Sequence, residues 1–326
     1  MTESPLVSAV IVNWNGAEHL KIALPTLTRQ TYSPLEILVV DNGSSDSSAD
    51  VAAEHEVKWV GLPQNRGLAP ACNAGAAKAT GDILIFLNND MRFPPDFVGA
   101  LVSVFHEDNE VFAADARQFD WEGANEIHSA TRMRRLSALA SALARGLIPG
   151  LDIAQERVRS VSDVMFASAA AMAVRRAMFE QLGGFDERLP IGWEDTEICW
   201  RAWLRGWRSV FVPDALCWHR VGASARNRNG ASASFRGTLG GRLLFATKHL
   251  PLPYVVATWV VSCLGFLKDV AAGHSGALVR RARVLAEYAG FVPSLLSERR
   301  RIYREVRTPP LAHFRRMLSI GHGHLA

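Results

Sequence analysis

The sequence predicts an α/β fold with a mostly parallel central sheet flanked by helices, followed by a helical C-terminal extension. Short β-branched apolar runs alternate with amphipathic segments over the first hundred residues, a pattern typical of parallel strands joined by helices. Polar residues follow every one of these runs, and the chain ends in an uncharged stretch joined to arginine-rich segments. The β-α-β-α-β-α-β order further implies right-handed crossovers.

The first four apolar runs are expected to be strands buried on both faces, because they are short, continuous and rich in Val and Ile. The amphipathic segments between them are expected to be the flanking helices. We place the strands at residues 7–12, 36–40, 57–60 and 83–87, and the helices at 17–30, 47–55 and 68–79.

A polar cluster follows each of the four predicted strands. The clusters are Asn13-Trp14-Asn15-Gly16, Asp41-Asn42-Gly43-Ser44-Ser45-Asp46, Asn65-Arg66-Gly67 and Asn88-Asn89-Asp90. Each could be an ordinary turn or helix cap, as when Ser45 or Asp46 caps the helix at 47–55. Because the carboxyl ends of parallel strands meet at the edge where α/β sheets bind ligands, we expect the clusters to form one site.

The composition indicates a globular protein with a sizeable core. The chain has 326 residues, 48% of them hydrophobic, and is unlike disordered, collagen-like or disulfide-framework proteins. Its cysteines have no metal-site spacing and are expected to be small buried thiols in a reducing compartment; they are Cys72, Cys199, Cys217 and Cys263. The N-terminal residues lack export-signal features, which predicts a cytoplasmic location for the catalytic body.

The net charge of +4 is unevenly distributed. Residues 251–326 carry 11 Lys and Arg against 4 acidic residues, whereas residues 1–250 sum to −3. A phosphate-tracking site should be basic on the folded body itself. The charge pattern therefore argues against a nucleic-acid partner.

The sequence gives no support to two common nucleotide-binding classes. No G-x-G-x-x-G follows the first strand and no G-x-x-x-x-G-K-[ST] occurs, as a dinucleotide dehydrogenase or a P-loop phosphotransferase would require. The phosphates of a bound nucleotide would instead be bound by a divalent cation, which an acidic residue after the fourth strand would hold.

An ordered set of motifs from about residue 5 to about residue 250 resembles the inverting family 2 glycosyltransferases of GT-A fold. The resemblance is greatest to the rhamnosyltransferase-like members of bacterial surface-glycan pathways. The motifs are VSAVIVNWNG, VVDNGSSDSS, NRGLAPACNAG, FLNND, GGFDE, WEDTEICWRAWLRGW and Trp218-His219. The resemblance implies a Rossmann-like GT-A domain at 1–249, with a nucleotide-sugar half at about 1–115 and an acceptor half at about 116–249, and an extension at 250–326.

The resemblance also implies which residues bind the nucleotide-sugar donor. Asp41 corresponds to the acidic residue that hydrogen-bonds the base. Asn13 and Asn15 correspond to first-loop contacts to the nucleotide, and Asn65 and Arg66 lie where the third loop closes over the base or ribose.

The segment Asn88-Asn89-Asp90 resembles the family's D-x-D motif with its first Asp replaced by Asn, so only Asp90 keeps a metal-binding carboxylate. All three are expected at the donor phosphates, with Mn²⁺ or Mg²⁺ as the implied cofactor. His219 follows a strand-like run at 209–212 and a short loop. In related enzymes a histidine here can be a metal ligand, and the alternative is a structural hydrogen bond.

Glu194 and Asp195 resemble the family's catalytic pair, and Trp193 before them is grouped with the donor-binding residues. Asp195 is expected at the N-terminus of a helix that ends at Gly206. Its helix dipole would keep the carboxylate ionised, as a general base near neutral pH must be. The buried face of this helix is predicted to comprise Ile198, Cys199, Ala202 and Trp203.

These assignments imply a metal-dependent single displacement with inversion. A sugar, with rhamnose as the first guess, would move from a nucleoside-diphosphate donor to a glycan or polyprenyl-diphosphate-linked acceptor. The alternative enzyme class is a nucleotidyltransferase, which would need a Gly-rich basic phosphate loop directly after the first strand. Residues 131–151 form a basic amphipathic segment, either a mobile acceptor or diphosphate lid or a solvated helix face.

Residues 250–267 are 18 uncharged residues, but Pro251 and Pro253 leave only 14 from Tyr254 onwards. A spanning helix needs about 20 residues, so we expect a helix at the interface. Arginine-rich segments at 280–283 and 299–307 are suited to anionic head groups. The extension is predicted to attach the enzyme peripherally to the cytoplasmic face of the inner membrane. The alternative is a helical element that covers the core or that joins two copies of the chain in a homodimer.

Overall fold

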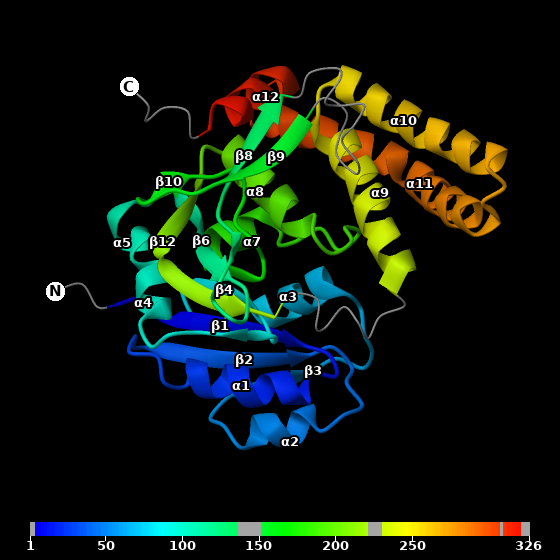
Figure 1. Ribbon diagram of the computed structural model, residues 1–326. Helices are drawn as coiled ribbons and strands as arrows, with labels where there is room; N and C mark the ends of the chain where they lie inside the picture. Colours follow the sequence, from blue (N-terminus) through cyan, green and yellow to red (C-terminus); the bar gives the residue numbers. More distant parts are fainter. Residues whose placement is uncertain (1–3, 136–150, 221–229, 307–308, 321–326) are drawn as a thin grey trace. The chain divides into compact units, whose positions relative to one another are not determined.

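The computed structural model describes residues 4–135, 151–220, 230–306 and 309–320 (Figure 1). The chain divides into two compact units. The first unit comprises residues 1–131, 155–187 and 194–228, and the second comprises 132–154, 188–193 and 229–326.

The first seven elements of the first unit confirm the predicted alternation of strands and helices. Each begins within one residue of its expected start, and the helices end two to three residues before their expected ends. The elements are β1 (Val7–Asn13), α1 (Ala17–Leu27), β2 (Leu35–Asp41), α2 (Ser48–Ala53), β3 (Lys58–Gly61), α3 (Leu68–Ala76) and β4 (Ile83–Asn88).

The elements that follow β4 are two long strands, several shorter strands and further helices. In order they are β5 (Met91–Arg92), α4 (Phe97–Val102), α5 (Val104–Glu107), β6 (Val111–Phe119), β7 (Glu126–His128), β8 (Ala130–Arg135), β9 (Leu151–Glu156), β10 (Ser162–Asp163), β11 (Ala171–Arg175), α7 (Arg176–Leu182), α8 (Glu194–Leu204) and β12 (Arg208–His219). Strands β8 and β9 pair with each other in a separate two-stranded sheet. Residues 132–154, which include most of both strands, belong to the second unit.

The central sheet has ten strands and is mixed. Its main order is β10-β12-β6-β11-β4-β1-β2-β3, with β5 paired to β12 and β7 paired to β6. The four strands β4, β1, β2 and β3 are parallel, whereas β11 runs antiparallel to both of its neighbours. The chain reverses its direction of travel across the sheet between β1 and β4, the position where such sheets bind ligands beyond the strand ends.

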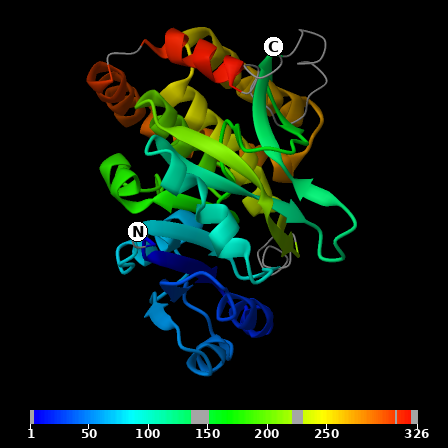
Figure 2. The ribbon, with the colours of Figure 1, turned by 90° about the vertical axis from the view of Figure 1, so that its left-hand side faces the viewer.

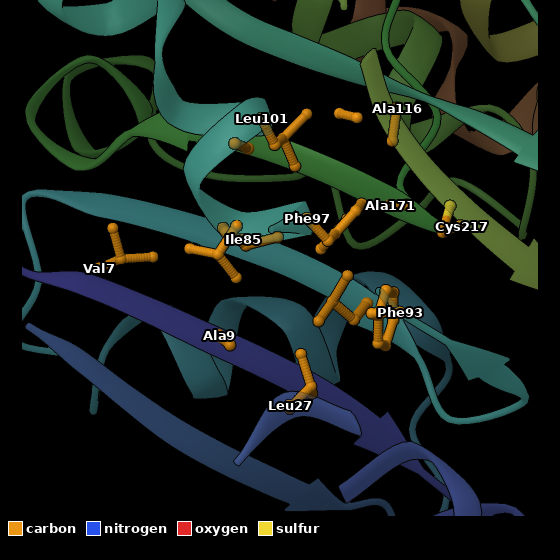
Figure 3. Packing of buried hydrophobic residues seen from close by; sticks show 14 of the residues in the cluster. Val7, Ala9, Leu27, Ile85, Phe93, Phe97, Leu101, Ala116, Ala171 and Cys217 are labelled. Atoms are coloured by element: carbon orange, nitrogen blue, oxygen red, sulfur yellow. The ribbon is translucent and has the colours of Figure 1, made fainter. Parts of the chain in front are cut away.

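Helices cover both faces of this sheet, and alternate residues of β1 point into two separate cores. Val7, Ala9 and Ile11 pack with residues of α1, α4 and α5. Figure 3 shows this core, where Phe97 and Leu101 approach Ile85 and Ala171. On the other face Val10 packs with residues of α3, α7 and α8, and Figure 2 gives a second view of the layers within the first unit. Strands β1, β2 and β4 are therefore buried on both sides, as predicted. The same expectation is wrong for β3, which lies at the edge of the sheet with Lys58 and Trp59 exposed.

Two local expectations need correction. His219 does not follow a short loop, because β12 continues through to His219 with an irregular register between Val212 and Leu216. Pro213 lies within that irregularity, and proline cannot donate a ladder hydrogen bond. The basic segment at 131–151 begins as strand β8 rather than as a helix, and its residues 136–150 lie outside the described part of the chain.

The described part of the second unit contains most of β8 and β9 and the helices α9 (Gly230–His249), α10 (Leu252–Ala271), α11 (Ser275–Glu305) and α12 (Pro310–Ser319). Leu243 of α9 and Tyr288 of α11 pack in its core together with Leu189. This compact unit therefore includes α9 and residues 188–193, whereas the predicted extension begins at residue 250.

Helix α10 presents an apolar surface to solvent. It is 20 residues long with a mean hydropathy of 1.4, and 11% of its most apolar stretch is buried. Among the described residues it is one helix whose length and composition would allow it to cross a membrane. Cys263 lies exposed on it, which corrects the expectation that all four thiols are buried; Cys72, Cys199 and Cys217 are buried.

Gly75 allows α3 to lie close to the sheet, which generates a stability prediction. A Cβ atom there would lie 2.4 Å from Val10 Cγ1 and 2.8 Å from Val40 Cγ2. We expect Gly75→Ala to lower the free energy of unfolding by about 1–3 kcal/mol through overpacking, despite the better helix propensity of Ala. Urea unfolding measures this change.

Gly99→Ala in α4 is the matched control, since its added Cβ would meet only the Tyr32 ring at 4.0 Å. This variant should be as stable as the parent chain or slightly more stable. Equal stability of the two variants would contradict the close packing of α3.

Candidate active site

A buried hydrogen-bond network joins the carboxyl ends of β1, β2 and β4. The Asn13 side chain at the end of β1 is fully buried; its Nδ2 donates to Asp41 Oδ1 over 3.1 Å, and its Oδ1 accepts from Asn89 Nδ2 over 2.7 Å. Gly16 lies against this network, because a Cβ atom there would fall 2.5 Å from Asn13 Oδ1 and 2.1 Å from Asn89 Nδ2. The structure thus brings together Asn13, Asp41 and Asn89 as the sequence predicts.

The first and second loops are joined by hydrogen bonds between Asn15 and two serines. The Asn15 amide donates to Ser44 Oγ over 2.7 Å, and Asn15 Oδ1 accepts from the Ser45 amide over 2.8 Å. Asn15 has φ 47°, a left-handed conformation that Asn tolerates better than most residues. Asp46 accepts from the Ala17 and Ser48 amides, so it caps the start of α1 as well as contacting α2.

The third loop is held by Asn42, which the sequence analysis did not single out. Its side chain is 1% exposed, donates to Asn65 Oδ1 and to the Gly67 carbonyl, and accepts from the Arg66 amide. The Arg66 guanidinium is exposed and lies 3.4 Å from Glu187 Oε2. Asn65 therefore shapes the loop, while Arg66 presents its charge to solvent.

Asp90 and His219 face each other beyond β4, as expected for a shared site. Asp90 Oδ1 and His219 Nε2 are 3.2 Å apart, both side chains are largely buried, and Asn88 Nδ2 lies 3.4 Å from the same imidazole nitrogen. Antiparallel pairing of β5 with β12 places His219 opposite Met91 and fixes this approach. Gln118 Oε1 lies 3.2 Å from His219 Nδ1 on the far side of the ring.

The donor set fits a divalent cation. If His219 donates its Nδ1 proton to Gln118, then Nε2 directs a lone pair at the Asp90 carboxylate, and two acceptors 3.2 Å apart favour a shared cation. Over the described ranges, no three His, Cys, Asp or Glu side chains form a group that could hold a metal. Asp90 and His219 would supply two ligands, leaving the other positions for donor phosphates and water.

Helix α8 begins at Glu194, which places Asp195 in its first turn as predicted. The predicted apolar face is buried, and Gly206 follows the helix with φ 88°. Glu197 and Arg201 form a buried ion pair within the helix. The Arg201 guanidinium also donates to the Leu182 carbonyl. This contact fixes the helix that carries Asp195.

Asp195 is a buried carboxylate held by backbone amides. Its Oδ1 accepts from the Thr196 amide over 2.6 Å and its Oδ2 from the Ala169 amide over 3.3 Å. Burial raises the pKa of Asp195 above its ordinary value, against the lowering effects of these two amides and of the His128 charge. A raised pKa makes a carboxylate a stronger base, and burial here opposes the ionising effect expected from the helix start.

Two further buried ionisable residues, Asp115 and His128, lie in the same region and were missed from the sequence. Asp115 is fully buried in β6, and His128 Nε2 lies 2.9 Å from its Oδ2. A signal was available, because Asp115 interrupts the apolar run of β6. Its partner could not be identified without the pairing of β6 with β7.

The remaining predicted site residues lie in different surroundings. Glu194 is 2% exposed. Trp193 belongs to the second unit, where its ring lies 5.5 Å from that of Phe245, and a Cβ at Gly241 would be 2.2 Å from Trp193 Cδ1. Trp193 therefore packs closely on α9, and its role in donor binding stays a prediction.

Comparison with solved structures supports the fold. The chain is similar to a mannosyltransferase of Pyrobaculum calidifontis, PcManGT, solved with GDP-Man and Mn²⁺, with 19% identity, a TM-score of 0.56, and coverage of 97% of this chain and 88% of that chain. It is also similar to GalNAc-T7, solved with UDP, GalNAc and Mn²⁺, with 19% identity, a TM-score of 0.57, and coverage of 78% and 49%. These likenesses identify the GT-A fold.

Characterised and uncharacterised relatives are glycosyltransferases. The chain is 28% identical over 247 residues to an N-acetylglucosaminyl-diphospho-decaprenol L-rhamnosyltransferase of Mycobacterium tuberculosis, covering 70% of this chain and 80% of that protein. It is 28% identical over 237 residues to a pre-mycofactocin glycosyltransferase of the same organism, of which it spans 46%. The profile of Glycosyl transferase family 2 matches residues 8–183, more than half of the chain. The chain therefore belongs to glycosyl transferase family 2.

Proposed function

We propose that this glycosyltransferase is metal-dependent and inverting, and that it moves a sugar, with rhamnose as the first candidate, from a nucleoside-diphosphate sugar to a lipid-linked or surface-glycan acceptor. The observation that carries the proposal is the buried carboxylate of Asp195 at the start of α8, a helix that packs on the same sheet whose strands β1, β2 and β4 end in the polar network. The residues proposed to bind the donor and the proposed base belong to one compact unit, which supports the proposal.

The donor would bind over the carboxyl ends of the parallel strands. Asp41 would accept from the nucleotide base, with Asn13 and Asn15 contacting the nucleotide and Asn65 and Arg66 closing over the base or ribose. The network supports these roles because it fixes the three loops against one another before any ligand arrives, which lowers the entropic cost of binding. In this proposal residues 1–115 serve the donor and residues 116–249 the acceptor.

Asp90 and His219 would hold the Mn²⁺ or Mg²⁺ ion, with Asn88 and Asn89 at the adjacent donor phosphates. When bound, the metal would stabilise the negative charge that develops on the departing diphosphate. The 3.2 Å approach of the Asp90 and His219 ligand atoms supports this assignment. Asn89 also donates to Asn13, so the loop after β4 is anchored to the nucleotide loop.

Asp195 would act as general base in a single displacement. As the acceptor hydroxyl oxygen bonds to the anomeric carbon, the bond from that carbon to the diphosphate oxygen breaks, and the hydroxyl proton passes to an Asp195 carboxylate oxygen. The burial that raises the pKa of Asp195 suits it to this task. Glu194, beside it and also buried, completes the proposed catalytic pair.

The substrate assignment is supported by one relative. The Mycobacterium tuberculosis protein is named for transfer of L-rhamnose to a decaprenol-linked diphosphate sugar. On that basis we propose a deoxythymidine-diphosphate rhamnose donor and a polyprenyl-diphosphate-linked acceptor for this chain.

We further propose that α10 attaches the enzyme to the cytoplasmic face of the inner membrane. Its exposed apolar side chains include Leu252, Val256, Val260, Leu264 and Leu267, each between 49% and 69% exposed. Exposure of so many large apolar side chains on one helix is typical of an interaction surface. The excess of Arg in residues 251–326 favours anionic lipid as the partner.

Donor binding is predicted to depend on the space at Gly16. Gly16→Ala would displace the side chains of Asn13 and Asn89, so we expect donor affinity to fall by at least about tenfold, equivalent to about 1.4 kcal/mol. Isothermal titration with the donor sugar nucleotide measures this. Gly61→Ala at the end of β3, where the nearest neighbour is Trp59 at 3.4 Å, should bind normally; equal affinities would contradict the proposed donor site.

Metal binding and catalysis should separate in two variants. Nucleotide-sugars should raise the melting temperature of the parent chain more with Mn²⁺ than without it, because ligands stabilise the state they bind. Asp90→Asn should lose this metal-dependent increment. Asp195→Asn should keep it and lose turnover by about 10²–10⁴-fold, the usual contribution of a general base. Near-normal turnover of Asp195→Asn would show that the base is assigned wrongly.

Membrane attachment is tested by sedimentation with vesicles of phosphatidylethanolamine and phosphatidylglycerol. The parent chain should sediment with vesicles at low salt, while Val260→Asp and Leu264→Asp should remain in the supernatant, since each places a charge on the apolar face of α10. Leu311→Asp, at a similarly exposed apolar position of α12, is the control and should bind. A parent chain that stays soluble throughout and dimerises would support the dimerisation alternative instead.

A further inference from the structure

We propose that Asp115 and His128 are positioning residues for the reaction, and that they place an imidazolium beside Asp195 to favour its ionised form. The inference rests on the proposed role of Asp195 as the base. Asp115 accepts a hydrogen bond from Ser168, the residue next to the one whose amide holds Asp195.

The Asp115 carboxylate needs a compensating cation. It is fully buried within β6, where an isolated ionised carboxylate would be strongly destabilising. His128 Nε2 lies 3.1 Å from Oδ1 and 2.9 Å from Oδ2, and the Ser168 amide donates to Oδ1 over 2.9 Å. Antiparallel pairing of β6 with β7 aligns Gln118 with His128 and so fixes the approach of the imidazole.

One short stretch of backbone holds both carboxylates. The amides of the consecutive residues Ser168 and Ala169 donate to Asp115 and Asp195 respectively, over 2.9 and 3.3 Å. The preceding residues are themselves fixed, since the Thr131 hydroxyl donates to the Phe166 carbonyl over 2.8 Å. The Asp115–His128 pair therefore has a defined position relative to Asp195.

The charges in this cluster act on one another. Burial alone would lower the pKa of His128, but the charge and hydrogen bond of Asp115, followed by the charges of Asp195 and Glu126, raise it. The His128 charge in turn lowers the pKa of Asp195, against the larger raising effect of burial. The imidazolium thus offsets part of the cost of an ionised base in a dry site.

Other ionisable groups near the pair are accounted for. Glu126 on β7 is held by Arg117 at 3.0 Å and by Arg157 at 3.3 Å, so its charge is matched outside the cluster. Burial, with a contribution from Asp195 and Asp115, raises the pKa of Cys199 on α8 to about 12, so this thiol stays neutral. In this set, His128 is the group whose single positive charge lies against Asp115 and also lowers the pKa of Asp195.

The decisive measurement is the pH profile of kcat/KM for sugar transfer. His128→Gln would leave the Asp115 charge uncompensated beside Asp195, which raises the pKa of the base. The acid limb of the profile should move to higher pH by about one unit. At pH values below the limb, kcat/KM should be about tenfold lower than that of the parent chain, and at high pH the two values should agree. Asp115→Asn combined with His128→Gln removes both charges, and its limb should return towards that of the parent chain.

His106→Gln on the exposed face of α5 is the matched control and should leave the profile unchanged. A His128→Gln profile that is lowered equally at every pH, with an unmoved acid limb, would overturn the inference and indicate a structural role alone. Turnover retained by Asp195→Asn would instead refute the base assignment, so the two failures can be distinguished.

A second measurement does not need activity. Nitrogen-15 chemical shifts of the histidine side chains should show His128 still charged above the ordinary pKa of histidine. Asp195→Asn should lower the titration midpoint of His128, because the coupling between two sites is reciprocal. An unchanged midpoint in that variant would overturn the inference even if His128→Gln fails to fold.

Discussion

The full burial of Asn13 constrains the donor side of this molecule more than any other single contact. An amide side chain removed from water must have partners for both its oxygen and its nitrogen. Because β1 lies between β2 and β4, Asn13 reaches Asp41 on one side and Asn89 on the other. Its requirement for partners therefore aligns three loops that are far apart in sequence, those that follow β1, β2 and β4.

The acceptor side depends on a different arrangement, in which backbone amides hold carboxylates. Asp195 occupies a helix start and Asp115 a strand interior, yet both accept from the segment that follows β10. This segment is short and tied to Thr131 at the start of the β8 hairpin. A displacement of Thr131 would thus be transmitted through this segment to the two carboxylates.

Local sequence patterns were sufficient for the first half of the fold. The strands and helices up to β4, the clustering of polar residues at the strand ends and the placement of Asp195 on α8 all follow from periodicity, caps or the family motifs. The Asp115–His128 pair, the anchoring by Asn42 and the unbroken course of β12 did not follow. Each depends on antiparallel pairing or on contacts between loops distant in sequence, where register is set by packing that no local pattern encodes.

The four cysteines give the chain a useful chemical asymmetry. Burial raises the pKa of Cys72, Cys199 and Cys217, so these thiols are neutral and shielded from reagents. Cys263 on α10 is exposed. Among the four thiols, Cys263 therefore offers one accessible attachment point for a fluorophore or spin label, and it reports on the surroundings of α10 without any change to the sequence.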